Sequence, residues 1–338
     1  PLREPISDSA SWMNAIRLQH GADVIAMDIP SGVNGDTGEI YPGAVLADLT
    51  LTIGVAKIGL LNANAVNHTG TIETVPLADL PAPENASPCL IDSHSLRGLL
   101  PRRPHAFHKG NAGRVGIVAG SRGMLGAAVL CATGALRSGA GLVTLFADES
   151  IYPMLAAMLP PEVMVKPVTS LSAVMVENLD VLAIGPGIGS LWDDGELFKL
   201  CADFQNPMVL DADALNRIAA NGVSKHLKEN MILTPHPGEM RRLFPESKDW
   251  NRELTATKFT ELYRGITLLL KGTHSIITRN DEPLSVNGSG NAGMASGGQG
   301  DVLTGVISGL LGQGMESLDA ARYGAWLCGR SSELAVSR

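Results

Sequence analysis

The sequence is poor in the residues that several classes of protein require. Aromatic residues make up only 4% of its 338 residues, which argues against a protein that stacks nucleic-acid bases. Lys and Arg number 26 against 34 Asp and Glu, and a formal net charge of −8 disfavours binding to a polyanion. No apolar run reaches the roughly 20 residues of a membrane-spanning helix. We therefore expect no nucleic-acid partner and no membrane association.

Cysteine is also scarce, with Cys89, Cys131, Cys201 and Cys328 scattered and forming no C-x-x-C pair. This pattern predicts neither a disulfide framework nor a zinc site, and it favours a reducing compartment. Residues 1–5 contain no signal-peptide core, so we expect a cytoplasmic protein. The 45% hydrophobic content and 38 glycines favour an α/β enzyme whose turns approach ligands closely.

The chain divides into two blocks. Residues 1–82 contain a helical start and two apolar strands at 24–28 and 49–54, too few elements to bury a good core alone. The proline-rich stretch 80–88 predicts a linker. We therefore expect a first domain over 1–82 and a second over 83–338.

The second block alternates short apolar strands with helical patterns. Strands are expected at 115–119, 142–146, 180–184, 208–210, 231–233, 266–270, 275–278 and 284–286. Continuous apolar strands separated by helices predict a parallel sheet that is buried on both faces. The last three strands lie close together and predict hairpin-like strands at an edge of the sheet.

Glycine-rich or polar turns directly follow many of these strands. They lie at 120–123, 185–189, 211–213, 234–239 and 271–272. In an open parallel sheet, ligands bind beyond the carboxyl ends of the strands. The sequence therefore predicts a ligand site at this edge of the sheet. Ala127, in a small-residue helix after the first of these turns, lies near enough to contact a ligand.

The loop 291–301 carries the strongest chemical signal. A glycine-rich loop that enters a helix presents backbone N–H groups and the positive end of the helix dipole, which suits a phosphate. It matches neither G-x-x-x-x-G-K-[ST] nor G-x-G-x-x-G. Asp301 at its end would repel a phosphate unless it serves as a general base. The alternative is a glycine turn with Asp301 as a simple helix cap.

Each of the other turns has a structural alternative. Asp211 and Asp213 could bind a metal or a ribose hydroxyl, although a helix-capping role is favoured for Asp213. His236, held between two prolines, is as well suited to a structural role as to ligand contact. The segment 271–275 could provide a cation and hydroxyls that contact a nucleotide. The alternative is that Lys271 is simply a solvated lysine at the end of a strand. For 108–111 a surface role is favoured.

Taken together, these segments resemble the ADP/ATP-dependent NAD(P)H-hydrate dehydratases. The matching pieces are 108–110, 120–123, 137–143, 185–189, 210–216, 233–239 and 291–301. They occur in the family's order over residues 89–338. The resemblance implies a ribokinase-like parallel-sheet sandwich of the α/β class. It also implies repair of NADHX and NADPHX, whose nicotinamide ring has taken up water.

The resemblance also implies residue roles. Asp301 would be the base at the ring hydroxyl, and the glycines up to Gly300 would form the anion hole. The hydrated dinucleotide would be contacted by Ala127, Gly187, Gly189, His236 and Asp301. The adenine nucleotide would be contacted by Lys271, Gly272, Thr273, His274, Ser275 and Gly300. ADP or ATP would act as co-substrate with Mg²⁺, phosphorylating the hydroxyl before phosphate leaves. Gln299 departs from the small or hydroxyl residue usual in the family.

The first block resembles the last part of a Rossmann-like NAD(P)H-hydrate epimerase domain. The matching pieces are 26–32, 36–39 and 56–61. By this resemblance Asp28 would contact the hydrated nicotinamide and Ser31 would bind K⁺. Most of that domain is absent, including its Asn-Asn-Gly-Gly-Asp-Gly loop, and the chain stops at Arg338, before the family's last helix would end.

The missing parts imply an internal fragment of a longer bifunctional protein. We expect the first block to be loosely held or to pair with a complementary chain, and to lack epimerase activity by itself. We also expect a homo-oligomer.

Two other classes stay open. A small-molecule kinase of the same fold, acting on a sugar, thiazole or pyrimidine alcohol, would keep the chemistry of Asp301, although 234–239 looks more like the dehydratases. A non-catalytic nucleotide-binding protein would not require Asp301. The preference for ADP or ATP is undecided.

Overall fold

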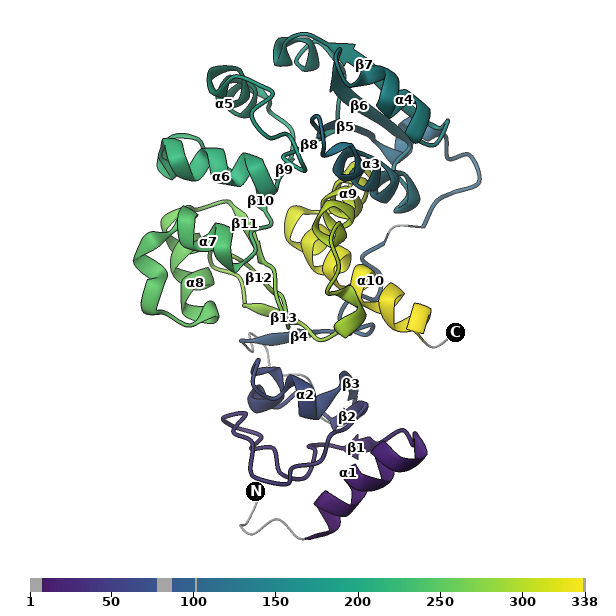
Figure 1. Cartoon of the computed structure of the whole chain (residues 1–338), viewed down its shortest axis with the longest axis vertical. Helices are drawn as coiled ribbons and strands as arrows, with labels where there is room; N and C mark the ends of the chain where they lie inside the picture. The colour runs from purple at the N-terminus through teal and green to yellow at the C-terminus, as the bar shows by residue number, and fades with distance from the viewer. Residues whose placement is uncertain (1–7, 78–86, 101, 337–338) are drawn as a thin grey trace.

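The structure is a computed structural model that describes residues 8–77, 87–100 and 102–336, and the described strands form two sheets (Figure 1). The smaller sheet is parallel, in the order β1 (Ile25–Met27), β2 (Leu49–Ile53), β3 (Thr71–Val75). The larger sheet has the order β4-β13-β12-β11-β10-β9-β8-β5-β6-β7.

The larger sheet is built from ten short strands. Their bounds are β4 (Cys89–Ile91), β5 (Arg114–Val118), β6 (Leu142–Asp148), β7 (Val163–Val168), β8 (Val181–Ile184), β9 (Met208–Leu210), β10 (Met231–Leu233), β11 (Thr267–Leu270), β12 (Ile276–Arg279) and β13 (Ser285–Asn287). All neighbours pair in parallel except β12, which is antiparallel to β11 and β13. The predicted parallel sheet is therefore confirmed.

The edges of this sheet differ from the prediction. The antiparallel strands β11 to β13 form as expected, but they are not at the edge, because β4 pairs with β13 and lies outside it. β4 has only three residues, too few to give a periodic signal. β7 forms the other edge, and it was missed because it contains Pro167 and is buried only at its two end residues. Proline is tolerated at a sheet edge, where one side of the strand needs no partner.

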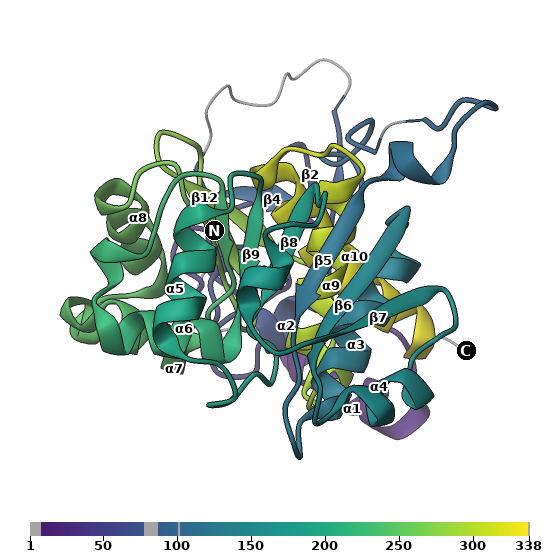
Figure 2. The same cartoon turned by 90° about the horizontal axis from the view of Figure 1, so that it is seen from above.

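Helices cover both faces of the larger sheet (Figures 1 and 2). One layer contains α5 (Asp194–Asp203), α6 (Ala212–Asn221), α7 (Pro237–Leu243) and α8 (Arg252–Leu262). The other contains α3 (Leu125–Arg137), α4 (Tyr152–Met158), α9 (Gln299–Gly312) and α10 (Ser317–Val336). Strand side chains alternate between the two cores: Val118 and Leu182 belong to one, Ile117 and Ala183 to the other. The architecture is an α/β sandwich of three layers.

Small residues bring α3 and α9 into close contact. A Cβ added at Gly134 would lie 2.7 Å from the Val302 carbonyl oxygen, and one at Gly305 would lie 2.0 Å from the Cys131 oxygen. The small residues of α3 therefore permit close packing on α9. This contact fixes the position of the helix that begins with the glycine loop.

The N-terminal block packs on the larger domain. Its helices are α1 (Asp8–His20) and α2 (Val66–Thr69), and α1 contributes to a small core within the block. Leu60, Leu61 and Ile72, however, belong to the same apolar cluster as Leu284 and Val286. The size of the block predicts that it is loosely held. This prediction is wrong, because the block packs against the larger domain. The shared cluster supplies the burial that eighty residues lack.

The outer edge of the small sheet agrees better with expectation. β1 is an outer strand of this sheet and exposes Ile25 and Met27, which leaves room for the complementary chain that we expect. The boundary at residue 82 and the part of the linker at 80–86 lie outside the described residues. Within 8–77, 87–100 and 102–336, no helix is both long enough and apolar enough to cross a bilayer.

Candidate active site

The sheet has a topological switch point between β5 and β8. From β5 the chain adds β6 and β7 on one side, and then β8 returns to the other side of β5. Ligands of open α/β sheets bind in the crevice at such a point. The Gly120 N–H donates to the Pro186 oxygen at 2.8 Å, which joins the loops that follow β5 and β8. The predicted site edge therefore contains the switch point.

Two predicted substrate contacts meet at this point. Gly187 has φ +62°, and a Cβ added there would lie 3.0 Å from Ala127 Cβ and 2.9 Å from Met124 Cβ. Only glycine fits between these neighbours in this conformation. Gly187 and Ala127 are thus adjacent, on the loop after β8 and the first turn of α3.

Asp213 serves the same loop. Its Oδ2 accepts the Gly189 N–H at 2.9 Å. The N-cap of α6 is Asp211, so the prediction that Asp213 caps this helix is wrong. The sequence motif favours a cap, but the fold brings the N–H of Gly189 within hydrogen-bonding distance of Asp213 instead.

A buried ion pair lies beside these loops. Lys271 Nζ donates to Asp211 Oδ1 at 2.6 Å, and the Thr304 hydroxyl donates to Asp211 Oδ2 at 2.9 Å. Lys271 Nζ also lies 4.0 Å from Glu239 Oε2. The side chains of Lys271 and Asp211 are 18% and 2% exposed, so the alternative of a solvated lysine is wrong. The cluster connects the ends of β9 and β11 with α7 and α9.

Metal binding by Asp211 is not supported by this geometry. Both of its carboxylate oxygens are already used by Lys271 and Thr304. Among the residues that the structure describes, no group of three or more His, Cys, Asp or Glu side chains is placed to hold a metal ion.

Asp301 lies inside the first turn of α9. The N-cap is Gly298, which adopts φ +92°, so Asp301 is not the simple helix cap that was the alternative. A Cβ added at Gly300 would lie 3.2 Å from Lys271 Nζ and 3.5 Å from Asp211 Oδ2. The residue before Asp301 therefore rests directly on the buried ion pair.

The surroundings of Asp301 raise its pKa to about 6. Burial is the largest cause, the negative charges of Asp211 and Asp213 add to it, and Lys271 acts in the opposite direction. A general base works best with a pKa near the working pH. The carboxyl is thus basic enough to take a proton while remaining ionised in neutral solution.

His236 has a clear structural role. It is the N-cap of α7, its Nδ1 accepts the Gly238 N–H at 2.9 Å, and Glu239 Oε2 accepts the His236 N–H at 2.8 Å. This reciprocal capping fixes the loop after β10. The ring is half exposed, with 51% of the side chain accessible, so its ligand contact stays a prediction. His108 likewise caps a short surface turn at 109–112, as favoured from the sequence.

Arg252, which the sequence analysis missed, holds the predicted nucleotide segment. Its Nη1 donates to the Thr273 oxygen at 2.6 Å and its Nη2 to the Leu270 oxygen at 3.1 Å. Gly272 has φ +146° and packs against the same guanidinium. Burial lowers the pKa of Arg252. Nothing local in the sequence indicates this contact, because it joins the start of α8 to the end of β11.

His274 faces away from the cluster. Its Nδ1 lies 3.1 Å from the Leu61 oxygen, in the N-terminal block, and burial lowers its pKa. Ser275 donates its hydroxyl to the Gly272 oxygen at 3.0 Å, which closes the turn. Gly272 and Thr273 are exposed and remain open to a ligand.

The glycine loop itself is largely exposed, and Gln299 occupies one side of it. The Gln299 amide donates to the Ser296 hydroxyl at 3.3 Å. The same residue lines a groove of about 510 Å³ between α3, α9 and α10, together with Leu130 and Val302. The departure at Gln299 therefore falls beside this groove.

Asp28 and Ser31 belong to the small sheet. Asp28 has φ +71°, pairs with Lys57 and accepts the Ile53 N–H at 3.0 Å. The hydrogen bond from Lys57 lowers the pKa of Asp28. Ser31 is exposed, and its carbonyl accepts the Val45 N–H at 2.8 Å. A non-glycine residue at positive φ is uncommon and often marks a functional site.

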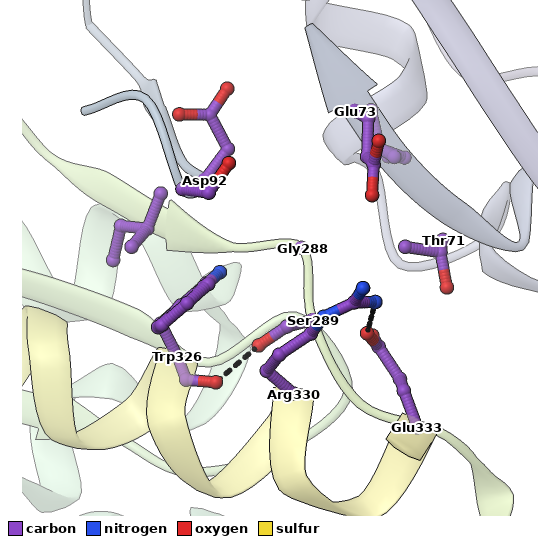
Figure 3. A pocket seen from close by; sticks show the side chains of 11 residues that line it. Thr71, Glu73, Asp92, Gly288, Ser289, Trp326, Arg330 and Glu333 are labelled. Carbon is purple, nitrogen blue, oxygen red and sulfur yellow. Dashed lines mark hydrogen bonds and ion pairs between the residues drawn. The ribbon is translucent and has the colours of Figure 1, made fainter. Parts of the chain in front are cut away.

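A small cavity lies between the N-terminal block and the larger domain (Figure 3). It has a volume of about 80 Å³, and Glu73, Asp92, Trp326, Arg330 and Glu333 are among its lining residues. Arg330 pairs with Glu333 at 2.7 Å. None of the predicted site residues lines it, so it is separate from the Asp301 cluster.

The three-layer sandwich and the glycine loop that ends in an acid define the class of protein, a ribokinase-like α/β enzyme. The chain matches the NAD(P)H-hydrate dehydratase family over residues 115–338 and the YjeF-related protein N-terminus over residues 1–59. It belongs to the NAD(P)H-hydrate dehydratase family. This membership favours a dehydratase over a small-molecule kinase or a non-catalytic protein.

Named relatives agree with this assignment. The chain is 39% identical to the bifunctional NAD(P)H-hydrate repair enzyme Nnr of Escherichia coli, over 100% of this chain and 66% of the relative. It is 38% identical to the Nnr of Moorella thermoacetica, over 97% of this chain and 65% of the relative. The chain thus spans about two thirds of the length of these relatives.

Solved structures agree as well. The ADP/ATP-dependent NAD(P)H-hydrate dehydratase from Bacillus subtilis, co-crystallised with ATP/Mg²⁺, superposes with a TM-score of 0.64 at 29% identity, covering 75% of this chain and 91% of that one. A ribokinase-like superfamily protein from Enterococcus faecalis gives a TM-score of 0.64 at 28% identity, over 73% of this chain and 88% of that one. The predicted fold class is therefore confirmed.

Proposed function

We propose that the chain dehydrates (6S)-NADHX and (6S)-NADPHX to NADH and NADPH at the expense of ADP or ATP. One observation carries the proposal: Asp301 follows an exposed glycine loop at a helix start, and its pKa is raised to about 6. This combination supports an anion site with a general base beside it. Family membership supplies the substrate class.

In the proposed reaction, Asp301 takes the proton of the ring hydroxyl as that oxygen attacks the terminal phosphorus of the nucleotide. The N–H groups up to Gly300 stabilise the negative charge on the phosphoryl group, because they are fixed before the reaction begins. The nucleotide departs one phosphate shorter. The bond between the ring carbon and the hydroxyl oxygen then breaks, phosphate leaves with that oxygen, the neighbouring ring carbon loses a proton to water, and the ring double bond returns.

The substrate contacts proposed for this reaction lie at the edge of the sheet that contains the switch point. Ala127, Gly187, Gly189 and His236 contact the hydrated dinucleotide. The nucleotide is contacted by Lys271, Gly272, Thr273, Ser275 and Gly300, and by the backbone of His274. The side chain of His274 is left out of this set because it bonds to Leu61.

Mg²⁺ belongs to the proposal as part of the nucleotide complex. The described residues offer no ready metal cluster, which suits an ion whose ligands are chiefly phosphate oxygens and water. When bound, Mg²⁺ would neutralise charge on the transferred phosphoryl group.

The test is to mix the purified chain with NADHX, Mg²⁺ and either ADP or ATP, and to follow the return of the absorbance of the reduced nicotinamide. We expect recovery that requires a nucleotide, and the faster nucleotide identifies the preferred co-substrate. Absence of recovery with both nucleotides contradicts the proposal.

For the N-terminal block we propose that the chain alone does not interconvert the R and S epimers. Ser31, the residue that the resemblance assigns to K⁺, is exposed, and K⁺ binding there stays a prediction. Incubation of the chain with the R epimer and K⁺ should leave it unchanged. Formation of the S epimer overturns this.

Three further points complete the proposal. We propose a homo-oligomer and a cytoplasmic location, and a complementary chain on the open edge of β1. Sedimentation of the purified chain tests the first. Restored epimerisation after addition of the missing part of the epimerase domain tests the last.

A further inference from the structure

The Asp211–Lys271 ion pair has a position that substrate binding alone does not explain. Both side chains are nearly enclosed, with 2% and 18% exposed. The Lys271 backbone N–H also donates to the Pro235 oxygen at 2.9 Å. Lys271 is thus attached to the loop after β10 through its backbone and to the end of β9 through its ammonium.

The pair is attached to the helix of the base from two sides. Thr304, one turn after Asp301 on the same helix, donates to Asp211 at 2.9 Å. Gly300 directly precedes Asp301, and a Cβ added at Gly300 would lie 3.2 Å from Lys271 Nζ. The first turn of α9 is therefore held against a fixed pair of opposite charges.

We propose that Asp211 and Lys271 are positioning residues for Asp301, which hold the first turn of α9 and set the charge beside the base. This inference rests on the proposed function of Asp301. It assigns the Lys271 ammonium a second task beside nucleotide contact.

Charged groups reach Asp301 from several elements. Asp211 and Asp213 come from the end of β9 and the start of α6, and both raise the pKa of Asp301. Lys271, from the end of β11, lowers it, and Glu239 of α7 lies behind Lys271. Cys131 of α3 is near as well, but burial raises the pKa of its thiol well above the usual range, so it stays neutral.

The two members of the pair should therefore have opposite effects on the base. Asp211→Asn leaves Lys271 without its counter-charge, so Asp301 ionises more easily and activity persists to lower pH. Lys271→Met leaves a carboxyl that is negative or shares a proton with Asp301, so the fall in activity moves to higher pH. The double variant has no net charge at the pair, as in the wild type, and should fall between them.

The experiment measures kcat/KM from pH 4.5 to 9 for these three variants and the wild type. We expect the acidic limb to move down in Asp211→Asn and up in Lys271→Met, each by roughly one pH unit, as for charges within about 4–6 Å. Lys258→Met is the matched control, because Lys258 pairs with Glu261 on the exposed face of α8. Its limb should not move.

A purely structural role would lower activity without opposite shifts. Shifts in the same direction, or an unmoved limb in Asp211→Asn, overturn the inference. Thermal unfolding identifies a variant that does not fold, and Asp211→Asn with the double variant still decides the matter if Lys271→Met fails.

A second readout separates this inference from the proposed function. The Asp301 carboxyl is titrated by carbon NMR in the chain without substrate, and its signal is identified by its loss in Asp301→Asn. If the wild type does not restore NADH but the titration moves down in Asp211→Asn, the function is wrong and the charge effect is right. If the titration does not move, the inference is wrong whatever the activity.

Discussion

Replacing Asp301 by Asn tests the chemistry at the glycine loop most directly. The amide keeps the size and hydrogen-bonding capacity of the carboxyl but cannot take a proton at neutral pH. General-base catalysis contributes typically 10²–10⁴-fold, so turnover should fall by about that factor. The wild type should also lose activity as the pH falls through about 6, where Asp301 takes up a proton.

The same substitution should make the folded protein more stable. The pKa of Asp301 is raised from 3.8 to about 6 on folding, so its ionised form is disfavoured in the folded chain. The folded state therefore holds the proton of Asp301 more tightly than the unfolded state. The stability that this contributes is fully present below pH 3.8 and is lost as the pH rises through 6. At 1.36 kcal/mol for each pH unit the loss is at most about 3 kcal/mol, and partial exposure reduces it to about 1–2 kcal/mol.

Two assays on the same samples check this reasoning. NADH recovery across pH gives turnover and its acidic limb, and urea unfolding at pH 5 and pH 8 gives stability. Asp301→Asn should be slow at every pH, should lack the limb near 6, and should gain more stability at pH 8 than at pH 5. Near-normal turnover, or a variant less stable than the wild type at pH 8, would refute the assignment of a base whose pKa is raised by partial burial.

Three other changes follow from the same contacts. Gly300→Ala forces a Cβ to 3.2 Å from Lys271 Nζ, and it should raise the nucleotide KM by about tenfold, measured with ADP and ATP. Arg252→Met leaves the Thr273 oxygen without its donor and should cost about 1–3 kcal/mol of stability, read from urea unfolding, while weakening nucleotide binding in calorimetry. Burial is the main cause that lowers the pKa of His274 below 6.5. The stability that its neutral form contributes is therefore fully present above pH 6.5 and is lost as the pH falls through the pKa of the folded state. His274→Gln should therefore flatten the acid loss of stability below pH 6.5, and an unchanged slope would contradict this.

The sequence predicts the sheet well where strands are continuous and apolar. β9 and β10 have the predicted bounds, and the antiparallel arrangement around β12 was foreseen from the close spacing of three strands. Periodicity is informative there because both faces of these strands are buried. It fails for β4 and β7, which form the edges of the sheet and therefore lack that pattern.

The site is predicted less completely, since contacts between distant residues leave no local signal. Asp211, Lys271 and Asp301 each follow or end a recognisable turn, so the sequence identifies them one at a time. The Asp211–Lys271 pair joins residues 60 positions apart, and the bond from Thr304 to Asp211 joins residues 93 positions apart, which no motif encodes. Arg252 was missed for the same reason.

The apolar cluster shared by the two blocks has a consequence for how the chain can be divided. A protein that begins at residue 87 would lose Leu60, Leu61 and Ile72 from that cluster and leave part of its remaining apolar surface uncovered. Exposed apolar surface of this kind promotes self-association. The N-terminal block therefore contributes apolar burial to the larger domain, whether or not it converts any substrate.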